Sequence, residues 1–204
     1  MKNILFILIA ILLLGTIGLG VDFFYTNHRM RSMATDDPNV RIALEQIGLS
    51  TPGGSTLILS AEKEAAIPSP VLWATWSRLE DWPSWSRPLH VSAHWLNEPE
   101  WKTGAKFEQK LNLGFPVGEV VSLEEVGPIT KGRRAMWSKN ENGIKSCHIW
   151  SFERLPEGKT RVSNIEVFQG FKVALIRPFV ARRWQQMFQA SVDGLVQRTQ
   201  NRNQ

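Results

Sequence analysis

The 204-residue sequence contains a single cysteine, Cys147, which excludes an intrachain disulfide and leaves no second thiol at metal-ligand spacing. It also lacks a Gly-x-Ser-x-Gly nucleophile elbow, a phosphate-binding loop, a Gly-x-Gly-x-x-Gly turn after a strand and a zinc signature. These absences remove the commonest motif-carrying enzymes, while enzymes without such motifs stay open. We therefore predict neither a metal nor another cofactor.

Acidic residues are scarce at the carboxyl end of the chain. The net charge is +5, and from Gly170 onward Asp193 is the single acidic residue. The basic residues of this segment are Lys172, Arg177, Arg182, Arg183, Arg198 and Arg202. No recognised nucleic-acid module accompanies them, and aromatic residues are not interleaved with them as on a base-stacking surface. We expect a solvated helix face, with a membrane surface as the alternative, and no nucleic-acid partner.

One long apolar run stands at the amino end. Residues 4–21 carry no charge, and at about 1.5 Å per residue they approach the roughly 30 Å hydrocarbon thickness of a bilayer. A cleavable signal peptide is the alternative, although its apolar region is usually shorter. We predict a single-pass transmembrane anchor over residues 1–25. The flanking basic residues do not decide which side of the membrane the rest occupies.

Residues 26–55 read as a linker with one possible short helix at 40–47, so we place the start of the folded domain at residue 56. Pro68 and Pro70 can open a helix. Trp82, Pro83 and Trp85 then predict a stiff, non-helical aromatic connector. Alternating patterns predict strands at 56–62, 90–96, 106–113, 117–126, 133–139, 145–154 and 160–169.

The last segment, residues 172–199, has the pattern of an amphipathic helix, with Val180, Trp184, Phe188 and Leu195 on its apolar stripe. A sheet with one apolar face and such a helix satisfy each other if the sheet curves around the helix. The sequence therefore predicts an α+β domain built as a curved antiparallel sheet around a long C-terminal helix.

An ordered series of segments carries a family resemblance. It consists of the strand at 56–62, the Pro-started helix, Leu-Glu-Asp-Trp-Pro-Ser-Trp at 79–85, Trp-Lys-Thr-Gly-Ala-Lys-Phe at 101–107, His-Ile-Trp-Ser-Phe-Glu at 148–153, and 160–170 before the final helix. The series resembles the START-like (SRPBCC) superfamily, and within it the polyketide cyclase/dehydrase and lipid transport group, over residues 56–200. The resemblance implies a helix-grip fold with an apolar cavity between helix and sheet.

The hairpin of the last two strands yields a candidate acid–base pair. If the loop 155–159 closes an in-register hairpin, Trp150 lies opposite Asn164 and His148 opposite Glu166. Aromatic content favours this face as the inner one, although Ile149, Ile165 and Val167 on the other face argue against it. A carboxylate beside a buried imidazole suits proton abstraction or carbonyl polarisation. A buried pair that satisfies its own hydrogen bonds is the structural alternative.

Aromatic side chains are candidates for the cavity wall, since ligand sites are mostly apolar with few polar groups. Core packing is the alternative interpretation for each of them. The predicted lining residues are Trp85, Phe107, Phe115, Trp137, Trp150, Asn164 and Phe168.

Three functions follow as hypotheses. The first is a membrane-anchored domain that binds a hydrophobic small molecule or lipid. The second is a cyclase- or dehydratase-like enzyme that uses His148 and Glu166. The third is a protein-interaction module of the cell envelope, which a broad apolar patch on the outer face of the sheet would favour.

Overall fold

The structure is a computed structural model and describes residues 20, 28–29, 32–33, 36–97 and 99–202. Within these residues no helix is both long enough and apolar enough to span a bilayer. The predicted anchor, residues 1–25, lies outside the described part of the chain apart from Gly20.

The domain is built on one antiparallel sheet of seven strands in the order β1-β7-β6-β5-β4-β3-β2. The strands are β1 (Thr56–Ala65), β2 (His90–Trp95), β3 (Lys106–Asn112), β4 (Glu119–Val126), β5 (Arg134–Glu141), β6 (Ile144–Arg154) and β7 (Thr160–Gln169). The last strand, β7, pairs with the first strand, β1, so all seven strands are in place before the final helix begins. The predicted register of the last hairpin is confirmed: Trp150 pairs with Asn164, and His148 with Glu166.

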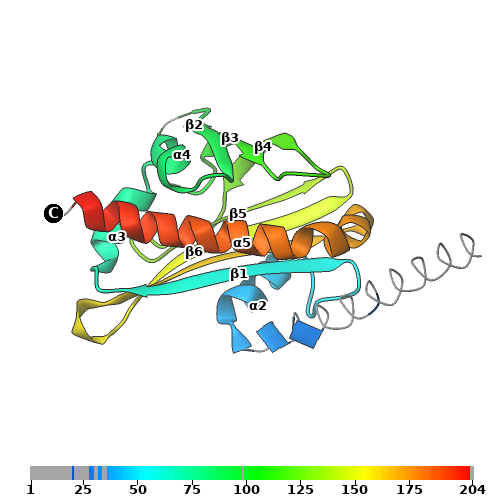
Figure 1. Cartoon of the computed structure of the whole chain (residues 1–204), viewed down its shortest axis with the longest axis horizontal. Helices are drawn as coiled ribbons and strands as arrows, with labels where there is room; N and C mark the ends of the chain where they lie inside the picture. Colours follow the sequence, from blue (N-terminus) through cyan, green and yellow to red (C-terminus); the bar gives the residue numbers. More distant parts are fainter. Residues whose placement is uncertain (1–19, 21–27, 30–31, 34–35, 98, 203–204) are drawn as a thin grey trace, which may run out of the picture.

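A single long helix, α5 (Phe171–Arg202), runs along the concave face of this sheet (Figure 1). The predicted apolar stripe is buried, as Val180, Trp184, Phe188 and Leu195 show. Burial of this stripe and of the inner sheet face provides the main apolar contribution to folding. The predicted curved sheet around a C-terminal helix is therefore confirmed.

The outer face of the central strands is covered by a second helix, α2 (Pro38–Gln46). Asp37 caps its first turn by accepting from the Asn39 backbone N–H at 2.8 Å. Leu44 and its neighbours on α2 pack against Ile149 and Ile165. This explains why the central strands are apolar on both faces. Part of the predicted linker 26–55 is thus docked on the domain.

The aromatic connector is more helical than its sequence predicts. After α3 (Ser69–Trp76) come a 3-10 turn, η1 (Leu79–Asp81), and a single helical turn, α4 (Trp82–Trp85). The prediction of a non-helical connector was therefore wrong. Pro83 is compatible with α4 because it stands in the first turn, where the missing N–H would have no partner.

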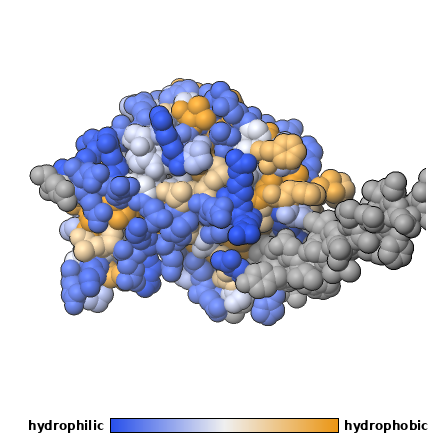
Figure 2. All heavy atoms as spheres, viewed as in Figure 1, coloured by the Kyte–Doolittle hydropathy of each residue, from blue (hydrophilic) through white to orange (hydrophobic). Residues whose placement is uncertain are grey.

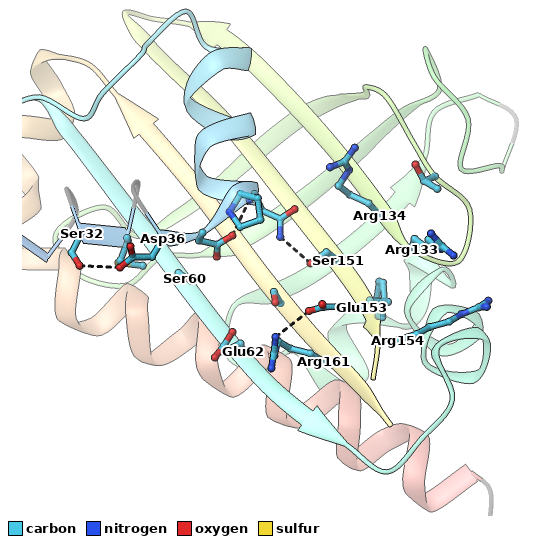
Figure 3. Close-up of a pocket in the computed structure, with 17 residues that line it drawn as sticks. Ser32, Asp36, Ser60, Glu62, Arg133, Arg134, Ser151, Glu153, Arg154 and Arg161 are labelled. Carbon is cyan, nitrogen blue, oxygen red and sulfur yellow. Dashed lines mark hydrogen bonds and ion pairs between the residues drawn. The ribbon is translucent and has the colours of Figure 1, made fainter. Parts of the chain in front are cut away.

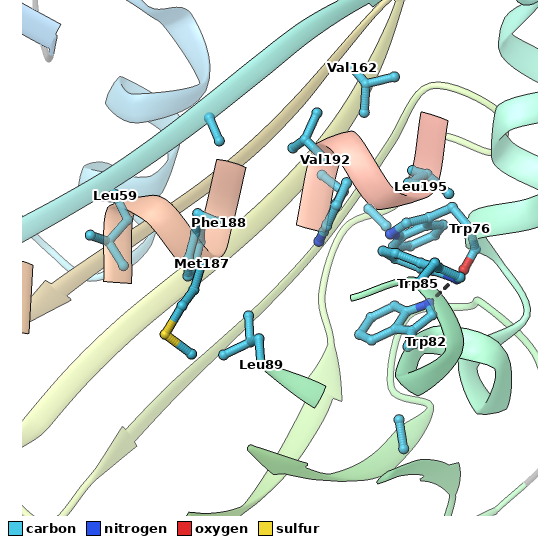
Figure 4. Packing of buried hydrophobic residues seen from close by; sticks show 14 of the residues in the cluster. Leu59, Trp76, Trp82, Trp85, Leu89, Val162, Met187, Phe188, Val192 and Leu195 are labelled. Atoms are coloured by element: carbon cyan, nitrogen blue, oxygen red, sulfur yellow. Dashed lines mark hydrogen bonds between the residues drawn. The ribbon is translucent and has the colours of Figure 1, made fainter. Parts of the chain in front are cut away.

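Tryptophan side chains fill one end of the space between helix and sheet (Figure 4). Trp76 and Trp82 lie with ring centroids 5.7 Å apart, and the indole N–H of Trp82 donates to the Trp76 carbonyl oxygen at 2.7 Å. Trp150 and Phe152 reach the same cluster from β6. Aromatic rings in mutual contact pack this end of the interior, whereas the other end holds a cavity.

Candidate functional site

The open end of the interior holds a cavity of about 340 Å³. Its apolar wall comes from β1, the β3–β4 region, β7 and α5, and includes Leu59, Leu113, Phe168, Ile176, Trp184 and Phe188. Polar side chains of the inner sheet face complete the lining: His90, Gln109, Ser122, Glu124, Lys139, Ser146, His148 and Glu166. Because side chains alternate along a strand, each of these strands presents every second residue to the same space.

His148 and Glu166 meet inside this cavity, as their register predicts. His148 Nδ1 lies 3.3 Å from Glu166 Oε2, and His148 Nε2 lies 2.6 Å from Asn164 Oδ1. The imidazole is held between two aromatic rings, with centroid distances of 4.5 Å to Trp137 and 5.4 Å to Phe188. Both ring nitrogens face oxygen atoms, so the ring is fixed in place and Glu166 is the more accessible member of the pair.

A second polar cluster lies on β2, β3, β4 and β5. The Gln109 side-chain oxygen lies 3.1 Å from His90 Nε2. The Gln109 side-chain nitrogen donates to Glu124 Oε1 at 3.1 Å. Ser122 Oγ donates to the same Glu124 oxygen at 2.6 Å, and Lys139 Nζ donates to Ser122. These five side chains form one continuous hydrogen-bonded network, so each buried polar group has a partner.

Burial shifts the titration of two members of this network. Desolvation raises the pKa of Glu124, against the opposing effects of the Ser122 hydrogen bond and the Lys139 charge. Burial lowers the pKa of His90 to about 3, and the charge of His148 acts in the same direction. His90 is therefore neutral near pH 7. The cavity combines a carboxyl group with raised proton affinity, Glu124, with the His148–Glu166 pair.

His90 and His94 do not form a metal site. The register between β2 and β3 shifts between His90 and Ser92, and the two histidines consequently leave β2 on opposite sides. His90 is buried, while the His94 side chain is 48% exposed. In the part of the chain that the structure describes, no three His, Cys, Asp or Glu side chains group closely enough to bind a metal ion.

A larger hollow, of about 860 Å³, lies on the outer face of the sheet beside α2 (Figure 3). Its walls are strongly polar, and Arg161 is bound to both Glu153, at 3.1 Å, and Glu64, at 2.8 Å. Asn39 of α2 donates to Ser151 across it at 3.3 Å. The lining of the inner cavity is the more apolar of the two, so the inner cavity is the candidate site for a hydrophobic ligand.

The family comparison agrees with this geometry. A family model described as polyketide cyclase / dehydrase and lipid transport matches residues 56–200, which is well over half of the chain. The chain belongs to this family. No curated protein sequence matches it significantly.

Solved structures related to this polyketide cyclase / dehydrase family member share its fold. A hypothetical protein from Helicobacter pylori aligns with a TM-score of 0.61 at 18% identity, covering 72% of this chain and 90% of that one. Zhui aromatase/cyclase from Streptomyces sp. R1128 aligns with a TM-score of 0.57 at 11% identity, covering 73% of this chain and 96% of that one. Norcoclaurine synthase from Thalictrum flavum aligns with a TM-score of 0.56 at 10% identity, covering 73% and 97%. At such identities the likeness concerns the fold alone.

The predicted cavity residues of the family member divide between the cavity and its surroundings. Phe168 lines the cavity, and Asn164 reaches it through its hydrogen bond to His148. Trp85, Phe107, Trp137 and Trp150 are buried in the aromatic core, and of these Trp137 touches the His148 ring. Phe115 was predicted to line the cavity, but it lies outside: it is 87% exposed in the turn between β3 and β4. Turn residues follow no strand alternation, which is why its direction could not be deduced.

Sequence reasoning missed the second polar cluster. Gln109 lies on the same buried face of β3 as Phe107. Glu124 and Ser122 share a face with Val126, and a charged residue between inward-facing neighbours on a predicted strand is the signal that could have found them. Lys139 lies on the same face of β5 as Trp137.

Proposed function

We propose that this member of the polyketide cyclase / dehydrase and lipid transport family binds a hydrophobic small molecule with one polar end. One observation carries the proposal: aromatic rings pack one end of the interior, and at the other end a cavity of about 340 Å³ has apolar walls and a few converging polar groups. Such a volume lies at the lower end of the usual range for ligand pockets. The ligand is therefore small, with a body that Phe168, Trp184 and Ile176 can surround.

The polar end of the ligand would meet Glu124 and Glu166. Two carboxyl groups facing one cavity favour a partner that donates hydrogen bonds, such as an alcohol or a phenol, over a carboxylate. Glu124, whose pKa is raised by burial, can also donate from its protonated form. As part of the same proposal, residues 1–25 anchor the chain in a membrane, from which such a ligand would partition.

Ligand content tests the proposal. The fragment 32–204 keeps α2, whose removal would expose the outer faces of β6 and β7. We expect this fragment, purified under native conditions and extracted with organic solvent, to release a defined apolar compound detectable by mass spectrometry. Ile176→Trp would fill the cavity and lower the ligand content, whereas Ala190→Trp, at an exposed position of the same helix, should leave it unchanged. A fragment that folds and carries nothing, even after incubation with long-chain alcohols, contradicts the proposal.

A second candidate function rests on the position of His148 and Glu166 inside the cavity. Both His148 nitrogens are engaged, by Glu166 and Asn164, so the geometry favours Glu166 as the group that takes a proton and His148 as the group that positions it. A cyclase- or dehydratase-like reaction on a bound carbonyl compound would use such a base. With the co-purified compound or an aldol-prone polyketide analogue as substrate, Glu166→Gln should abolish turnover while retaining binding. Equal turnover by the parent protein and the Glu166→Gln variant would contradict catalysis by Glu166.

The third hypothesis, an interaction module, receives little support from the sheet. Its outer face is covered by α2 over β6 and β7, and the neighbouring hollow carries paired charges.

A further inference from the structure

Four large apolar side chains are exposed around the start of α5. Phe171, Leu175 and Phe179 are 74%, 57% and 66% exposed, and their spacing of four residues places them on one face of the helix. Phe115 is 87% exposed in the β3–β4 turn. Figure 2 shows apolar residues gathered at this end of the molecule. We call these four residues the apolar rim.

The β3–β4 turn lies beside α5, which brings Phe115 to the same region as the helical residues. The indole N–H of Trp184 donates to the Leu113 carbonyl oxygen at 3.0 Å. The guanidinium of Arg183 occupies the space beside Gly114, where a Cβ atom would lie 2.2 Å from its central carbon. Phe115 follows Gly114 directly, and Arg183 stands one helical turn after Phe179.

The apolar rim neighbours the cavity along two segments of the chain. Val173 and Ile176 of α5 line the cavity from the same two turns that expose Phe171, Leu175 and Phe179. Leu113 and Val117 line it from the segment that exposes Phe115. The start of α5 and the β3–β4 segment therefore each present apolar side chains to solvent on one side and to the cavity on the other.

The charged side chains that α5 presents near the rim are all basic. Lys172, Arg182 and Arg183 are exposed, and none of them forms an ion pair with another residue of the described chain. The nearest acidic residue along α5 is Asp193, which is bound to Lys63 at 2.7 Å. A surface of aromatic and aliphatic side chains edged by free basic groups complements anionic lipid headgroups above an apolar interior.

We propose that the apolar rim docks on an anionic lipid bilayer and turns the edge of the cavity toward the membrane. Phe115, Phe171, Leu175 and Phe179 enter the interfacial region, and Lys172, Arg182 and Arg183 contact the headgroups. The consequence for ligand transfer rests on the proposed function, but docking itself does not, because it requires only the surface residues. A hydrophobic ligand could then pass between bilayer and cavity with little exposure to water.

Spin labels on the full chain in vesicles test the docking. Cys147 is buried and its pKa is raised to about 12 by that burial, so an introduced exposed cysteine can be labelled selectively. Phe179→Cys places a label on the rim. Lys159→Cys is the matched control, since it lies at the β6–β7 hairpin, at the opposite end of β7 from the start of α5. Vesicles of phosphatidylcholine with phosphatidylglycerol are compared with vesicles of phosphatidylcholine alone.

We expect the label at 179 to become several-fold less accessible to a water-soluble relaxing agent than the label at 159, and only with phosphatidylglycerol present. The Lys172→Glu and Arg182→Glu substitutions should weaken binding to the anionic vesicles by about fivefold per unit of charge at low salt. The label at 179 should then be more accessible to the relaxing agent. Equal accessibility of both labels in anionic vesicles overturns the proposal. Spin–spin broadening at 179 in lipid-free detergent also overturns it, because it would show that a second copy covers the rim. Mass spectrometry of ligand in the same samples reports separately on the proposed function.

Discussion

Gly194 of α5 lies directly against the backbone of Trp85 in α4. A Cβ atom on Gly194 would lie 1.9 Å from the Trp85 carbonyl oxygen, far inside any permitted contact distance. One turn away, the hydroxyls of Ser191 and Ser86 lie 2.6 Å apart. This junction holds the C-terminal half of α5 tightly on the aromatic core, whereas the cavity lies under the preceding part of the helix.

Gly194→Ala is predicted to destabilise the domain. The added methyl group meets backbone rather than a flexible side chain, so α4 or α5 must move, and overpacking of this kind costs about 1–3 kcal/mol. Urea unfolding of the fragment 32–204 measures the effect. The exposed substitution Gln186→Ala on the same helix is the control and should change stability by less than about 0.5 kcal/mol. A Gly194→Ala protein as stable as the control would show that the junction is loose.

Leu44→Ala tests whether α2 is part of the folded domain. Leu44 is 1% exposed and belongs to the outer cluster with Ile149 and Ile165. Its truncation should lower the free energy of unfolding by about 2–5 kcal/mol, as is usual for buried leucines. Glu45→Ala, at an exposed position of α2, is the control. If both variants unfold at the same urea concentration as the parent, α2 contributes nothing to stability.

His90 should make the fold sensitive to acid. Because its pKa is lowered to about 3 from 6.5, the unfolded chain binds a proton below pH 6.5 that the folded chain does not. The stabilising contribution is therefore present above pH 6.5 and is lost as the pH falls toward 3, by up to about 1.4 kcal/mol per pH unit. His90→Gln removes this dependence. Urea unfolding at several pH values should show a shallower acid loss in the variant, and parallel pH profiles would contradict the prediction.

Glu124 should act with the opposite sign. Its raised pKa means that the folded chain keeps a proton that the unfolded chain releases, so its contribution is full below pH 4.5 and is lost as the pH rises through the folded pKa. Glu124→Gln cannot release a proton. Relative to the parent, we expect this variant to gain stability as the pH rises from 4.5 toward neutral. A difference that does not change with pH would mean that Glu124 titrates normally in the folded protein.

The register of the last hairpin could be predicted from the sequence because a short loop and strict alternation leave few arrangements. The pairing of His148 with Glu166 and of Trp150 with Asn164 follows from that register. The apolar outer residues, such as Ile149 and Ile165, gave a conflicting signal. Their burial depends on α2, which lies far away along the chain, and a local pattern does not contain that information.

The division of the interior could not be predicted either. Aromatic residues suit a cavity wall and a packed core equally well, and their placement depends on how close the helix comes to the sheet at each level. Gly194 and Trp85 fix that distance at the aromatic end. Trp150 and Phe107 consequently became core residues, whereas Phe168, beyond the aromatic end, lines the cavity.

The cavity as a binding site for a hydrophobic ligand is tested most directly by locating such a ligand in a crystal. Crystals of the fragment 32–204 grown with a brominated long-chain alcohol would reveal the bromine by its anomalous scattering. We predict an anomalous peak inside the cavity, among Phe168, Trp184 and Phe188, with the hydroxyl end near Glu124 or Glu166. A well-ordered crystal with bromine only on the outer surface, or with no bromine and a collapsed cavity, would contradict this function.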